Sequence, residues 1–98
     1  MGKYLVLWEV DQTKIPMDPK ERGAGWGALM AMVRQDLEKG NVKDWGAFVG
    51  ETGGYNISEG SEVEIMKIHQ QYVPFITFKV YPVATEDQTN EMIKALSG

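Results

Sequence analysis

Two segments near opposite ends of the chain, residues 3–10 and 75–83, are apolar on both of the faces that a β-strand presents. Side chains alternate across a strand, so the first segment directs Leu5 and Leu7 to one side and to the other side Tyr4, Val6, Trp8 and Val10. The last segment divides in the same way. One side carries Ile76, Phe78 and Val80. The other side carries Phe75, Tyr81 and Val83, together with the polar residues Thr77 and Lys79. A sheet of such strands needs cover on both faces, because soluble monomers rarely expose large apolar patches. We expect helices on one face and a second copy of the chain on the other.

Three helices are predicted by capping residues and apolar spacing. The first begins at Asp18 and Pro19, with the Asp18 side chain as acceptor for free backbone N–H groups, and ends at Gly40. Its apolar stripe consists of Trp26, Leu29, Met30, Val33 and Leu37. A capping box of Ser61 and Glu64 opens a second helix that continues to Pro74, and Thr85 with Gln88 opens a short third one through Met92, Ile93 and Leu96.

Residues 42–50 and 55–59 read as two further strands. They are joined by Thr52, Gly53 and Gly54, whose glycines accept the positive φ of a tight hairpin. The order is therefore β-α-β-β-α-β with a terminal helix, the pattern of a ferredoxin-like α+β fold. With 98 residues, the chain has room for one core, and we expect a single domain over residues 1–98.

Composition and charge exclude several classes of function. A net charge of −4, from 14 acidic and 10 basic residues, leaves no basic stripe for phosphate groups, so nucleic acids and anionic membranes are not expected partners. The absence of cysteine excludes disulfides and thiolate chemistry. Near the start, the longest apolar run covers Tyr4 to Trp8 and is too short for a signal peptide or a membrane span. We expect a soluble cytoplasmic protein.

The predicted hairpin of residues 49–57 (Val-Gly-Glu-Thr-Gly-Gly-Tyr-Asn-Ile) resembles that of the muconolactone isomerases, with a similar Val-Gly-Glu, a short spacer and an aromatic residue that enters the next strand. The second helix, which ends in Pro74-Phe75 before a strand, is also similar, and the likeness spans Trp45 to Val83. It implies membership of the dimeric α/β barrel superfamily, in which two ferredoxin-like protomers pack sheet against sheet. Small uncharacterised domains of that superfamily are similar too. Shared fold does not transfer activity, and Glu51 is the one polar match.

His69, the only histidine, is the candidate for a catalytic residue. It lies three or four positions from Ile65, Met66 and Tyr72, so it should face the sheet, either as a general base or as a buried histidine bonded to a backbone carbonyl. With it we group the candidate ligand-binding residues, namely Trp8, Trp45, Tyr55, His69 and Tyr72. No metal site and no cofactor are predicted, because no second histidine or clustered carboxylates accompany it.

Gly23, Gly25 and Gly27 lie within the first predicted helix and lack the spacing of a phosphate-binding loop. They either loosen the start of that helix or let Trp26 approach a neighbouring backbone closely.

We therefore expect a homodimeric α/β barrel protein that binds a small, partly apolar molecule between its sheet and its helices. Two alternatives stay open. One is a cofactor-free enzyme, an isomerase or a monooxygenase acting on an aromatic-derived acid or lactone. The other is a structural or partner-binding module. An enzyme needs a buried polar group with a shifted pKa in an open pocket, whereas a packing module fills the same space with side chains.

Overall fold

A computed structural model describes residues 2–98 of the chain. The elements follow in the order β1 (Gly2–Val10), a 3-10 turn (Gln12–Lys14), α1 (Pro19–Lys39), β2 (Val42–Ala47), β3 (Gly53–Gly60), α2 (Glu62–Gln70), β4 (Ile76–Val83) and α3 (Glu86–Leu96). This is the expected β-α-β-β-α-β order with a C-terminal helix, and the α+β, ferredoxin-like class is confirmed.

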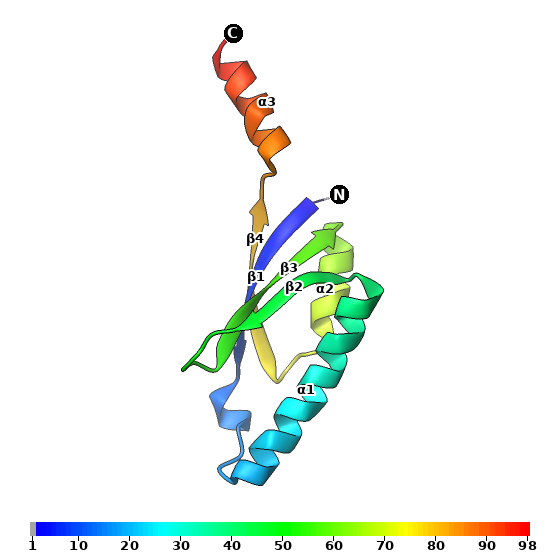
Figure 1. The fold of residues 1–98 in the computed structure, drawn as a ribbon, viewed down its shortest axis with the longest axis vertical. Coiled ribbons are helices and arrows are strands. Elements are labelled where there is room, and N and C mark those ends of the chain that lie inside the picture. The colour runs from blue at the N-terminus through cyan, green and yellow to red at the C-terminus, as the bar shows by residue number, and fades with distance from the viewer. Residues whose placement is uncertain (1) are drawn as a thin grey trace.

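One antiparallel sheet holds the molecule together, with the strand order β2-β3-β1-β4. The first strand of the sequence therefore lies in the interior of the sheet, between β3 and β4. β4 lies at the edge of the sheet, as Pro82 in its sequence indicates. Helices α1 and α2 lie together on one side of the sheet, and α3 stands apart beyond the end of β4 (Figure 1). We call the uncovered side the open face.

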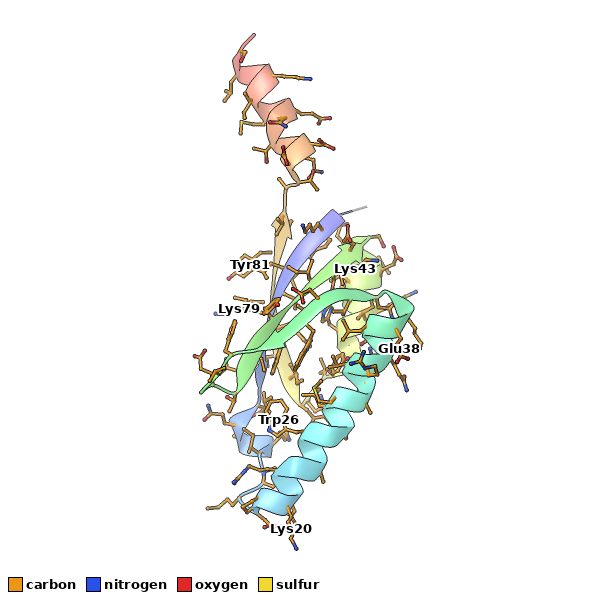
Figure 2. All side chains as sticks on the ribbon, viewed as in Figure 1. Lys20, Trp26, Glu38, Lys43, Lys79 and Tyr81 are labelled. Atoms are coloured by element: carbon orange, nitrogen blue, oxygen red, sulfur yellow. The ribbon has the colours of Figure 1, made fainter. Side chains whose placement is uncertain are left out.

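Strand register separates the two faces as the alternation of apolar residues predicts. Val6 and Trp8 are buried under the helices, and with Val33, Tyr72 and Ile76 they form much of the core. The open face carries Leu5 and Leu7, which pair across the ladders with Ile57 and Tyr55 on β3 and with Tyr81 and Lys79 on β4. Figure 2 shows Lys79 and Tyr81 projecting from β4 away from α1 and α2.

Both capping boxes form as predicted, at Ser61 with Glu64 and at Thr85 with Gln88, and Gly40 ends α1 in the left-handed conformation with φ 76°. Asp18 differs from the prediction. It occupies the N-cap of α1, but its side chain makes no capping hydrogen bond, and Pro19 in the first turn has no N–H to offer. The first turn of α1 is held instead by its backbone, with the Arg22 N–H donating to the Asp18 carbonyl at 3.0 Å.

The predicted hairpin turn is wrong in its position. β2 ends at Ala47 and β3 begins at Gly53, so the loop between them covers residues 48–52, and its positive φ belongs to Gly50 at 86°. Gly53 and Gly54 are extended strand residues whose lack of a side chain serves close approach. A Cβ on Gly53 would lie 2.6 Å from the Trp8 carbonyl oxygen, and one on Gly54 would lie 2.0 Å from that of Gly46.

α2 is also shorter than predicted, because it ends at Gln70 and residues 71–75 form turns before β4. The Tyr72 N–H bonds to the His69 carbonyl and the Val73 N–H to that of Gln70, which tightens the chain away from α-helical spacing. The apolar residues that suggested a longer helix, Tyr72 above all, reach the core from this turn. Within residues 2–98, none of the helices is both long and apolar enough to span a bilayer.

Candidate functional site

His69 faces the interior of the protein, as its position in the sequence predicts. It lies one turn after Ile65 on the inner side of α2, and its side chain is 6% exposed. Its Nδ1 lies 2.8 Å from the Ile65 carbonyl oxygen, and its Nε2 lies 3.1 Å from Nδ2 of Asn56 on β3. The His69 ring also meets Phe78 edge-on, with a centroid separation of 4.7 Å.

These contacts fix the protonation of the ring. A carbonyl oxygen only accepts, so Nδ1 carries the proton and donates to Ile65, while Nε2 accepts from the Asn56 amide. Ser58 Oγ donates in turn to Asn56 Oδ1 at 2.8 Å, which sets the orientation of that amide. Burial lowers the pKa of His69 below its ordinary value of 6.5, outweighing the Ile65 carbonyl and Asp36, which act to raise it. His69 is thus a neutral residue with both nitrogens paired.

A buried carboxylate, Asp36 of α1, forms the second polar cluster. Its side chain is 4% exposed, and Oδ2 accepts hydrogen bonds from Tyr72 Oη at 2.5 Å and Gln71 Nε2 at 2.9 Å. Asn41 Nδ2 donates to Oδ1 at 3.1 Å. Burial, reinforced by the Asp36 hydrogen bond and charge, raises the pKa of Tyr72 far above the usual tyrosine range. Together these contacts satisfy the carboxylate without a cationic partner.

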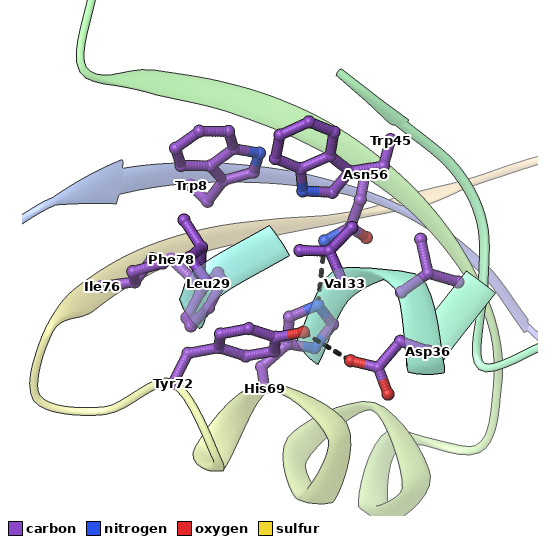
Figure 3. A pocket seen from close by; sticks show the side chains of 11 residues that line it. Trp8, Leu29, Val33, Asp36, Trp45, Asn56, His69, Tyr72, Ile76 and Phe78 are labelled. Atoms are coloured by element: carbon purple, nitrogen blue, oxygen red, sulfur yellow. Dashed lines mark hydrogen bonds between the residues drawn. The ribbon is translucent and has the colours of Figure 1, made fainter. Parts of the chain in front are cut away.

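Aromatic rings form the wall opposite these clusters. Trp8 of β1 stacks on Trp45 of β2 at a centroid distance of 5.3 Å, and Trp26 of α1 meets Trp8 edge-on at 6.2 Å. Figure 3 shows Trp8 and Trp45 on the sheet side, with His69, Tyr72 and Asp36 facing them from the helix side. The cavity left between them measures about 20 Å³, which is room for one water-sized molecule.

Four of the five candidate ligand-binding residues therefore surround one cavity: Trp8, Trp45, His69 and Tyr72. The fifth, Tyr55, lies on the open face, where its hydroxyl donates to Asp44 Oδ2 at 2.8 Å and its ring stacks near Phe48. That hydrogen bond raises the pKa of Tyr55. A ligand-binding role for these residues remains a prediction.

Asp36 and Asn56 complete the site but were not among the candidates drawn from the sequence. Asp36 had a readable signal, since it falls three residues after Val33 on the apolar stripe of α1, where a carboxylate requires partners. Asn56 had no such signal, because it alternates with Tyr55 and Ile57 and so falls on the polar side of β3, which the structure buries.

A larger cleft of about 470 Å³ lies at the end of the sheet beside the β2–β3 loop. Leu7 and Lys79 of the open face line it, together with Phe48 and Glu51 of the loop. Across residues 2–98, no three histidine, aspartate or glutamate side chains are grouped closely enough to hold a metal ion. In comparisons with known proteins, the sequence matches no protein-family model and no curated protein.

Proposed function

We propose that this chain acts as a homodimer of the dimeric α/β barrel kind, which binds a small, partly apolar molecule between its sheet and its helices. The observation that carries the proposal is the open face. It presents half-buried leucine, isoleucine and tyrosine side chains beside the exposed Tyr81, on a sheet that has α1 and α2 on its other side. A second sheet is the simplest cover for such a face.

The composition of the open face suits pairing with itself. Its apolar centre consists of Leu5, Leu7, Tyr55, Ile57 and Tyr81. We expect the paired faces to bury on the order of 1,500 Å², typical of a stable homodimer. On β1 the apolar pair is flanked by Lys3 at one end and Glu9 at the other. A two-fold axis that reverses the strand direction brings Lys3 of each copy toward Glu9 of the other, so opposite charges meet at the rim.

The space between sheet and helices offers a ligand aromatic walls and two polar clusters, the mixture that small-molecule sites use. A ligand larger than water needs that space to open. The first half of α1 is suited to this movement, because Gly23, Gly25 and Gly27 lower its helical stability by roughly 1 kcal/mol each relative to alanine. Trp26 belongs to the same segment and rests on Trp8. We therefore take this half of α1 as the lid of the site.

The hydrogen bonds of the site favour binding over catalysis. A general base needs a free lone pair directed at the substrate, but Nε2 of His69 accepts from Asn56. Among the described residues, every buried side-chain nitrogen and oxygen has a hydrogen-bond partner. An isomerase or monooxygenase would first have to break one of these pairs. A polar ligand group could instead share them, for instance by bonding to the Asn56 amide.

The dimer is tested by placing a charge at the centre of the open face. Wild-type protein should elute with about twice the 11.0 kDa chain mass in size exclusion with light scattering at micromolar concentration. Leu7→Lys should give a monomer of native circular dichroism, because two lysines would be buried against apolar partners. Met66→Lys provides the matched control, since Met66 is 70% exposed on the outer side of α2. A monomeric wild type would contradict the dimer.

Ligand binding is tested by NMR with ¹⁵N-labelled protein and a panel of benzoate, phenylacetate and unsaturated five-membered lactones. We expect at least one compound to shift the His69 ring signals together with the indole signals of Trp8 and Trp45, because all three line the same cavity. Shifts confined to Phe48, Glu51 and Lys79 would place the ligand in the larger cleft and overturn the proposed site. A panel without any shift would count against small-molecule binding.

A further inference from the structure

Helix α3 buries none of its residues against the rest of the described chain, residues 2–98. Every residue from Ala84 to Gly98 is exposed, and the helix stands beyond the end of the sheet, joined to β4 by Ala84 and Thr85 (Figure 1). With this helix included, the molecule is 61 Å long but only 26 Å and 19 Å across.

The sequence of α3 nevertheless has the features of a helix that packs against another surface. Its capping box is complete, with Thr85 N–H donating to Gln88 Oε1 at 2.8 Å and Gln88 N–H donating to Thr85 Oγ1 at 3.2 Å. Met92, Ile93 and Leu96 form one apolar stripe and are 52%, 49% and 79% exposed. A helix of 11 residues is marginal in water by itself. The stripe therefore needs a partner surface to keep α3 folded.

The second copy of the chain proposed for the open face would lie next to the start of α3 and could supply this partner surface. β4 carries Tyr81 and Val83 on the open face, and α3 follows Val83 after two residues. The interface is thus continuous with the start of α3. We propose, on the basis of the homodimer, that α3 is an exchanged arm: the stripe of Met92, Ile93 and Leu96 packs against the second copy of the chain.

The surface of the second copy that α3 contacts can be inferred from the positions of the exposed helical segments. α3 extends past one end of the sheet, and the first half of α1 extends past the opposite end (Figure 1). Trp26 and Met30 remain 37% and 38% exposed on that half, and Trp26 meets Trp8 of the core edge-on. A two-fold axis that reverses the strands brings each α3 to the end of the dimer where the first half of α1 of the other copy extends past its sheet. This is the same direction of pairing that matches Lys3 with Glu9.

The contact can be observed directly in a mixed dimer of ¹³C,¹⁵N-labelled and unlabelled chains. Isotope-filtered NOE spectra should connect the methyl groups of Ile93 and Leu96 in the labelled chain with protons of the unlabelled chain, including the Trp26 indole. NOEs confined to one chain would show that α3 folds back on its own protomer and would overturn the exchange. Random-coil shifts for residues 86–96 would overturn it as well.

A charge-matched pair of variants measures what the stripe contributes. Met92→Glu/Leu96→Glu adds two negative charges on the stripe, and Asn90→Glu/Lys94→Gln makes the same change of net charge on the other side of α3. We expect the dissociation constant of the dimer to rise about tenfold or more for the first variant and to stay within about twofold for the control. Equal affinities, in a protein whose Leu7→Lys variant is monomeric, would refute the exchanged arm and leave the sheet-face dimer intact. A monomeric wild type would refute the dimer itself.

Discussion

His69 contributes to stability only while it is neutral, because both of its ring nitrogens are committed to partners that suit the neutral form. If Nε2 were protonated, its N–H would face the N–H of the Asn56 amide, and two donors would meet with no acceptor between them. Burial lowers the pKa of His69 in the folded protein below its ordinary value of 6.5. The unfolded chain therefore takes up a proton at a higher pH than the folded chain does.

The sign of the pH dependence follows from this difference. The His69 contribution is fully present above the unfolded pKa, near 6.5, and is lost as the pH falls from there through the lowered folded pKa. Within that pH range, His69 lowers the free energy of unfolding by at most about 1.4 kcal/mol for each unit by which the pH falls. Urea unfolding between pH 7.5 and 4.5 should show this extra slope in wild-type protein and not in His69→Gln, which should retain the fold. Parallel profiles would contradict the assignment.

Asp36 illustrates a residue whose role the sequence indicates only in part. Its position on an apolar stripe predicts that it needs partners, but the partners come from the α1–β2 turn and from the turn after α2. Local spacing contains no information about which segments meet there. The aromatic and histidine candidates were easier to predict, because periodicity alone places His69 on the inner side of its helix and Trp8 on an apolar face of its strand.

At the level of the element, the glycines of α1 make a measurable prediction. A Cβ on Gly23, Gly25 or Gly27 would meet no atom of a neighbouring element within 4 Å, so these glycines do not serve close approach. Alanine should therefore be accommodated without clash, and each substitution should stabilise the helix by about 0.5–1 kcal/mol. Thermal unfolding of the triple alanine variant should show the gain, with Gly54→Ala as the contrasting case that unfolds at a lower temperature, because its Cβ meets the Gly46 carbonyl.

The same triple variant tests the lid. A stiffer first half of α1 should slow the association of any compound that shifts His69, with little change in the spectrum of the bound state. Stopped-flow tryptophan fluorescence would measure this rate. An unchanged association rate in a variant of raised stability would show that the ligand enters by another route.

Elements governed by local chemistry could be predicted from the sequence, and elements governed by distant contacts could not. Both capping boxes and the Gly40 end of α1 depend on residues within four positions of each other, and all three formed as expected. Gly53 and Gly54 looked like turn residues by the same local criteria. Their true role depends on Trp8 and Gly46 on neighbouring strands, a contact that no short window of sequence contains.

For the whole molecule, the order of elements and the two-sided apolar strands were sufficient to predict the sheet and its open face. The placement of α3 was not predicted, since its stripe indicates only that it packs and says nothing of where. The volume of the central cavity also could not be derived from the sequence. It depends on how Trp8, Trp45 and Tyr72 fill space between elements, which is a property of three-dimensional packing.

The interior position of β1 also determines when the fold can be completed during synthesis. β1 is made first, yet its two neighbours are β3, which ends at Gly60, and β4, which ends at Val83. Until β4 leaves the ribosome, one edge of β1 has no partner strand. Pairings so distant in sequence also close slowly. The sheet can therefore be completed only after residue 83 has left the ribosome, and until then the unpaired edge of β1 is open to pairing with other chains.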